Sequence, residues 1–105
     1  MKLNISLVLE TDKEKNALVV VSGLNKLISA GSPILEKYKD GGTKVLLEKS
    51  ITETNWSDAL LTCLTLAQSF GRSWTVSGHV EEELILIGNE FSVVGIKWAQ
   101  ISLIS

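Results

Sequence analysis

The stretch that decides the fold is SWTVSGHVEEELILIGNEFSVVGIKWAQISLIS, residues 73–105. Turn signals interrupt it at Gly78-His79 and at Gly88-Asn89. Between these turns the residues are β-branched, aromatic or alternating, a composition typical of strands. The stretch therefore predicts an antiparallel meander that forms the floor of the fold.

The N-terminal part predicts a strand followed by a helix. Residues 2–10 alternate, and one face carries only apolar side chains: Leu3, Ile5, Leu7 and Leu9. The run Thr11-Asp12-Lys13-Glu14 reads as a capping box that opens a helix, which we expect to reach about Ala30. Its apolar stripe has helical spacing: Ala17, Val20, Val21, Leu24, Leu27 and Ile28. Leu18 and Val19 widen the stripe, so we expect a mostly covered helix that ends at a left-handed Gly31.

Residues 32–43 allow two interpretations. They form either the first strand of a hairpin that turns at Asp40-Gly41-Gly42, or a short helix that begins at Pro33. We favour the hairpin, and in both cases residues 44–51 form a strand. A second helix is expected to open at Asn55, with Asp58 in its first turn. It should run to about Phe70 and present one apolar face: Trp56, Leu60, Cys63, Ala67 and Phe70.

This order predicts a single α+β domain over residues 1–105. We expect a mostly antiparallel sheet of five or six strands with two main helices on one face, because each helix has a stripe to bury. If the hairpin forms, the N-terminal part is a βαββαβ unit of the ferredoxin-like type, extended by C-terminal strands.

Charge sets limits on the partners. The net charge is −2, which argues against direct binding to nucleic acid, since that needs a surplus of Lys and Arg. Residues 1–50 carry eight Lys and six acidic residues, a balance of +2, whereas residues 51–105 have a balance of −4. Recognition by the second half should therefore favour a basic partner. Residues 59–71 are too short and too polar to span a bilayer, and residues 1–15 do not form a signal peptide, so we expect a cytoplasmic protein.

The sequence contains no motif that predicts catalysis, a cofactor or a metal site. Cys63 is the single cysteine and lies in an apolar helical stripe, where a cysteine behaves as a small hydrophobic residue. His79 is the single histidine and follows a turn glycine. A catalytic thiol needs a partly exposed, electropositive setting, so we interpret Cys63 as a buried structural residue and expect no enzyme activity.

The run Glu81-Glu82-Glu83 is the sharpest polar feature. It lacks the interleaved spacing of a calcium loop, and adjacent exposed glutamates do not acquire the different environments that acid–base catalysis requires. Two interpretations stay open: a solvated turn between strands, and a docking patch for a basic partner. Among the tryptophans, Trp98 lies on a candidate strand with a mixed face, so it is a candidate for an interface.

The run FSVVGIKWAQISL, Phe91 to Leu103, resembles the closing strands of small bacterial immunity proteins. These proteins are made beside the toxins of contact-dependent growth inhibition and related polymorphic toxin systems. The resemblance implies a cytosolic protein without enzyme activity that binds one cognate toxin domain, often a nuclease, and blocks its active site or substrate surface. Since such families differ widely in fold and interface, it implies no binding residue by position.

We therefore expect an inhibitor that occludes a basic toxin domain by one-to-one binding, without a cofactor and without contact to a membrane. The residues proposed to bind the partner are Glu81, Glu82, Glu83, Glu90, Asp40 and Trp98. Two alternatives stay open. One is a ligand-binding or enzymatic domain whose pocket contains His79 or Cys63. The other is a subunit that forms a homodimer through edge strands, with residues 92–105 as an apolar edge that carries only Lys97 as a charge.

Overall fold

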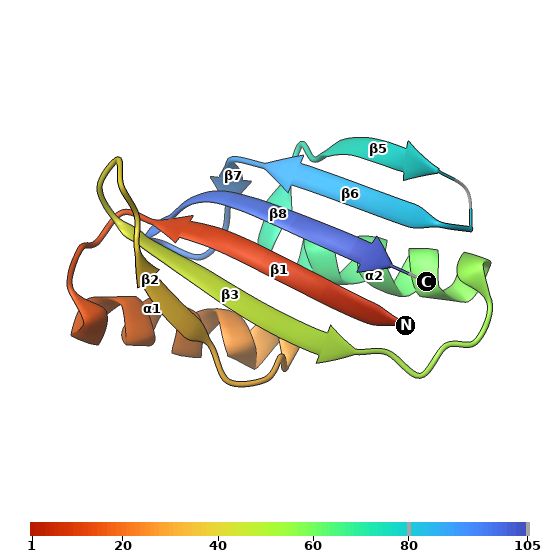
Figure 1. The fold of residues 1–105 in the computed structure, drawn as a ribbon, viewed down its shortest axis with the longest axis horizontal. Coiled ribbons are helices and arrows are strands. Elements are labelled where there is room, and N and C mark those ends of the chain that lie inside the picture. The colour runs from red at the N-terminus through yellow and green to blue at the C-terminus, as the bar shows by residue number, and fades with distance from the viewer. Residues whose placement is uncertain (80, 105) are drawn as a thin grey trace.

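The structure is a computed structural model that describes residues 1–79 and 81–104. Helices and strands follow the predicted order, with two additional two-residue strands (Figure 1). In chain order they are β1 Lys2–Leu9, α1 Glu14–Ile28, β2 Ile34–Lys37, β3 Thr43–Ser50, α2 Trp56–Phe70, β4 Gly71–Arg72, β5 Thr75–His79, β6 Glu83–Gly88, β7 Glu90–Phe91 and β8 Ile96–Ile104.

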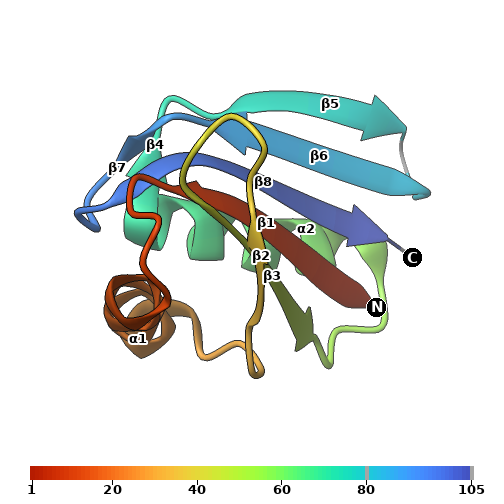
Figure 2. The ribbon, with the colours of Figure 1, turned by 60° about the vertical axis from the view of Figure 1, so that its left-hand side comes forward.

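Six of these strands form one antiparallel sheet in the order β2-β3-β1-β8-β6-β5. Both helices cover the same face of this sheet, and the other face carries no helix (Figures 1 and 2). The predicted α+β class and the layering of two helices on one face are therefore confirmed. β4 and β7 pair separately as a short ribbon beside the end of α2.

The core lies between the sheet and the helices. The alternation of β1 buries Leu3, Ile5, Leu7 and Leu9 completely or almost completely. Strand pairing continues this face across the neighbouring strands, because residues opposite each other in an antiparallel pair point to the same side. The facing residues from β3 and β8 are Val45, Leu47, Ala99, Ile101 and Leu103. The helices close the core with Ala17, Val21, Leu24, Ile28, Ala59, Cys63, Leu66, Ala67 and Phe70.

The path of the chain after α2 places the last strand at the centre. β2, β3 and β1 take the order of a ferredoxin-like unit, in which β1 lies beside β3. The place on the other side of β1 is taken by β8, after the chain has run out to β5 and returned through β6. β8 is paired on both sides, with β1 and with β6. The expectation that residues 92–105 offer an open edge is therefore wrong.

The β2–β3 hairpin is confirmed, and it is tied to the start of α1. Asp12 accepts a hydrogen bond from the backbone N–H of Gly42 at 2.5 Å, and the Thr43 hydroxyl donates to the carbonyl of Thr11 at 2.8 Å. The predicted capping box is wrong. α1 begins at Glu14 after Lys13, which provides no side-chain cap, and the Thr11 hydroxyl accepts from the N–H of Lys13 instead of from the first turn of the helix.

The far end of α1 also differs from the prediction. Ser29 (φ 51°) adopts the left-handed conformation that was expected at Gly31. The side chain of Asn25 makes this possible, since its oxygen accepts from the N–H of Ala30 at 3.1 Å. Leu18 and Val19 are 45% and 68% exposed, so α1 is covered along one stripe only.

The predicted cap of α2 is confirmed. The side chain of Asn55 accepts a hydrogen bond from the N–H of Asp58 at 2.9 Å.

The β2–β3 turn provides a test of the fold with a matched control. Gly41 and Gly42 both have positive φ, 94° and 92°. A Cβ on Gly42 would collide with the carbonyl oxygen of Leu9, whereas a Cβ on Gly41 would meet nothing within 4 Å. We expect Gly41→Ala to cost about 1 kcal/mol through its backbone conformation, and Gly42→Ala to cost about 2 kcal/mol more because the backbone must move. Urea unfolding measures both, and equal losses would show that the close approach to Leu9 is not a constraint.

Candidate functional site

The two edges of the sheet are unequal. β2 has four residues, follows Pro33, and carries Glu36 and Lys37, which are features that protect an edge from pairing with another chain. β5 has the sequence TVSGH, contains no Asp, Glu, Lys or Arg, and is exposed at all five positions. Its ladder runs to β6 alone among the described residues. Because an antiparallel strand turns its N–H and C=O groups to both sides, β5 presents unpaired backbone groups along its outer side.

A cleft of about 300 Å³ lies between β5 and the first turns of α2. Trp56 and Leu60 are one helical turn apart and form the α2 wall. The β5 wall includes Val76, which is 56% exposed. Val76 is paired with the buried Leu86 of β6, so its side chain lies on the helix side of the sheet. Leu84 of β6 completes the apolar lining. This β5 cleft therefore combines an aromatic side chain, aliphatic side chains and an open strand edge.

The turn between β5 and β6, which carries the three glutamates, lies at one end of the cleft. Gly78 has φ 139° and lies so close to the carbonyl oxygen of Glu83 that a Cβ would collide with it. His79 and Glu83 then face each other across the ladder and both line the cleft. Glu81 (φ 65°) is exposed at the turn, and the N–H of Glu82 donates to the carbonyl of His79 at 3.1 Å. The three glutamates therefore lie at one corner of the sheet.

The start of α2 adds acidic groups at the same end of the molecule (Figure 1). Asp58 lies in the first turn of α2. Glu53, in the preceding loop, accepts a hydrogen bond from the Thr62 hydroxyl at 2.8 Å. This bond lowers the pKa of Glu53, because it stabilises the charged form. The end of the sheet that holds the β5–β6 turn is therefore negatively charged near neutral pH.

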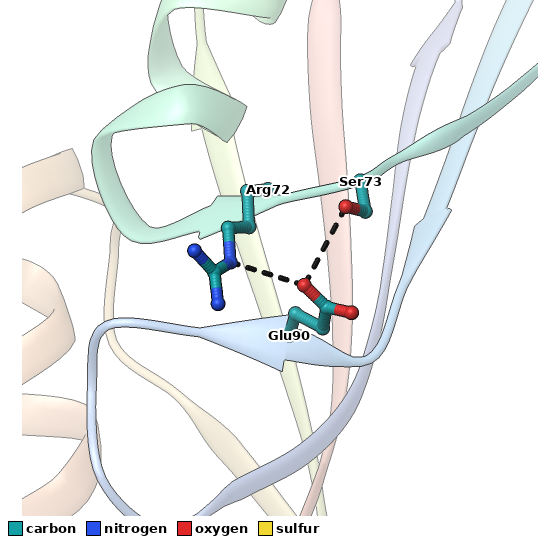
Figure 3. Close-up of polar contacts among 3 residues, drawn as sticks. All are labelled: Arg72, Ser73 and Glu90. Atoms are coloured by element: carbon teal, nitrogen blue, oxygen red, sulfur yellow. Dashed lines mark hydrogen bonds and ion pairs between the residues drawn. The ribbon is translucent and has the colours of Figure 1, made fainter.

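The structure separates Glu90 from the three glutamates. Glu90 lies on β7, beyond the far end of β6, where its carboxylate is engaged by two residues of the opposite segment (Figure 3). Its Oε2 accepts from Nε of Arg72 at 3.0 Å and from Oγ of Ser73 at 3.5 Å. The carboxylate of Glu90 is therefore compensated by an internal cation.

Asp40 and Trp98 also lie elsewhere. Asp40 is exposed in the β2–β3 turn, at the end of the sheet opposite the β5–β6 turn (Figure 1). Trp98 is half-buried on β8 opposite Val8, on the face of the sheet that carries no helix. The six predicted residues thus fall into separate places, and only the glutamate run borders the β5 cleft.

Cys63 and His79 occupy different environments. Cys63 is completely buried on α2, as the apolar stripe predicted. Burial raises the pKa of the Cys63 thiol to about 11, which keeps it protonated and makes it a poor nucleophile. His79 is exposed at the end of β5. Within residues 1–79 and 81–104, no group of three or more His, Cys, Asp or Glu side chains is arranged to hold a metal ion.

Phe70, Trp74 and Phe91 form an aromatic cluster. Trp74 packs edge-to-face on Phe70 and on Phe91, with ring centroids 5.4 and 5.9 Å apart. Its ring also lies against Gly71 and Gly88, where a Cβ would leave too little room. The cluster anchors the β4–β7 ribbon to the end of α2. Trp74 is therefore a packing residue, in contrast to Trp56 at the cleft.

Comparisons of the chain with protein-family models, with curated proteins and with solved structures found no match. Neither helix in the described part of the chain is both long and apolar enough to cross a membrane. The β5 cleft and the glutamates beside it are therefore the candidate functional site.

The raised pKa of Cys63 predicts how stability depends on pH. The pKa of the thiol is about 11 in the folded state, whereas an exposed thiol has a pKa of 9.0. The unfolded chain therefore loses this proton first, and the free energy of unfolding should fall as the pH rises from 9 towards 11. We expect Cys63→Ala to show a smaller fall over this range, measured by urea unfolding at each pH. If both proteins lose stability equally, the burial of the thiol has no effect on its ionisation.

Proposed function

We propose that this chain is a binding protein that recognises a basic protein domain through the β5 cleft and the glutamates beside it. The observation that carries the proposal is the combination found at this one corner of the sheet. An uncharged open strand, an apolar cleft with a tryptophan and a run of acidic side chains lie together there. Tryptophan in a partly desolvated pocket is a frequent centre of protein interfaces, and surrounding charges select the partner.

An inhibitory role in the cytoplasm follows from the same features. A nuclease presents basic side chains to the phosphates of its substrate. A protein with a negatively charged end can occupy that surface and can be steered towards it by long-range attraction. The residue pattern of 91–103, which resembles the closing strands of immunity proteins, supports this role. We therefore propose one-to-one occlusion of a toxin domain, with no chemical step performed by this chain.

The first test is complex formation. The chain would be mixed at low salt with the product of the neighbouring upstream gene, the expected basic toxin domain, and the mixture analysed by size-exclusion chromatography. We expect a one-to-one complex whose affinity falls with increasing salt, because screened charges attract less. A mixture that elutes as two separate proteins at low salt would contradict the proposal.

The second test locates the charges. Replacing Glu81 and Glu83 together by Ala should slow association with that domain about tenfold at low salt, with a smaller change in the dissociation rate. Asp40→Ala is the matched control, since Asp40 is an exposed carboxylate at the other end of the sheet. It should leave both rates unchanged. Stopped-flow kinetics at low and high salt measures the effect, and an equal slowing by Asp40→Ala would exclude the β5–β6 corner as the docking site.

A further inference from the structure

We propose that the partner binds by adding a strand to the outer side of β5, so that the sheet continues into the partner molecule. This inference rests on the proposed function and specifies how the β5 cleft is used. Strand addition obtains its affinity from backbone hydrogen bonds and its specificity from pockets that accept alternate side chains. The structure provides both elements at this edge.

The backbone element is β5 itself. Of the six strands in the sheet, four are paired on both sides, which leaves β2 and β5 as edges. β2 carries the protecting features described above, whereas TVSGH has no charged side chain that would hinder an approaching strand. Five residues of β5 match an added segment about 17 Å long. The free backbone groups of β5 can therefore be satisfied by one short extended segment.

The side-chain element is the cleft next to that edge. Side chains of an added strand alternate between the two faces of the sheet. On the helix side they would lie over the space bordered by Val76, Trp56 and Leu60, which is apolar and accepts an aliphatic residue. On the other side they would lie beside Thr75, Ser77 and His79, all exposed. The cleft thus selects a strand with aliphatic residues at alternate positions.

Charge identifies the class of strand. Glu83 is paired with His79 and therefore lies on the helix-free face of the sheet, and Glu81 is exposed at the turn that follows β5. A strand with Lys or Arg at the positions between its aliphatic residues would point these cations to the same face, where they would compensate the two carboxylates. A second copy of this chain would not, because β5 itself contains no Lys or Arg. We therefore infer a basic strand from another protein as the occupant, and not β5 of a second copy.

The experiment uses a defined probe, a capped peptide in which Lys alternates with Val. A peptide in which Glu alternates with Val is the control. Amide hydrogen exchange of the full chain is measured residue by residue by NMR at low salt, with and without each peptide. We expect the Lys–Val peptide to slow exchange at alternate residues of β5 about tenfold or more, since those N–H groups become hydrogen-bonded. The Glu–Val peptide should leave β5 unchanged.

Two variants separate use of the cleft from general attraction. Val76→Arg places a cation beside the apolar cleft at a position that is 56% exposed, so the fold should tolerate it. It should weaken binding of the Lys–Val peptide about tenfold through like-charge repulsion and loss of the apolar contact. Val94→Arg adds the same charge at a residue that is 89% exposed and lies outside the cleft lining. It should change the affinity less than about twofold.

The remaining outcomes would overturn strand addition. If the Lys–Val peptide leaves β5 exchange unchanged, or if both arginine variants weaken binding equally, the partner does not pair with β5. If the free protein already shows slow β5 exchange that depends on protein concentration, a second copy occupies the edge. A stable complex with the neighbouring basic domain in any of these cases would leave the proposed function standing. Absence of that complex would overturn the proposed function itself.

Discussion

The structure depends on β1, which is paired along its length on both sides, with β3 and with β8. Its four inward leucine and isoleucine side chains form the centre of the core, and both helices pack over the face that they share. Within the six-stranded sheet, β3 and β8 pair with β1 directly, and β2, β6 and β5 are joined to β1 through these two strands. β5 is the strand farthest from β1, and among the described strands it is joined to the sheet only through β6. The open edge and its cleft are consequences of how the chain completes the sheet around β1.

Local patterns in the sequence predicted most of the elements. The alternation of residues 2–9, the Asn55 cap and the Asp-Gly turn each act within a few residues, and the structure confirms them. The capping box was wrong because α1 begins later than the pattern predicts, at Glu14, while Thr11 and Asp12 bind the β2–β3 turn far along the chain. The central place of β8 was missed because the apolar composition of residues 96–104 suits a central strand and an unprotected edge alike. Only the order of pairing distinguishes these two possibilities.

The candidate site was predicted in part. The glutamate run was identified because three adjacent acidic residues are visible in any sequence. The cleft beside it was not, since Trp56 and Val76 belong to different elements that meet only in the folded chain. One feature of the sequence did indicate the open strand beside the cleft, namely the absence of charged residues in TVSGH. Glu90 illustrates the opposite case: the sequence predicts that its charge is available to a partner, whereas in the fold Arg72, eighteen residues earlier, compensates it.

The pairing of Lys2 with Ile104 has a consequence for how the protein folds. The first and last strands of the sheet are neighbours in space and distant in sequence, so this contact closes a loop that includes nearly all of the described chain. Such non-local pairing raises the contact order and slows folding. During synthesis β1 has one unpaired edge until β8 has been made, and an unpaired apolar strand is prone to aggregate. The early steps must therefore rely on the β2–β3 hairpin and the two helices to shield β1 until the last strand takes its place.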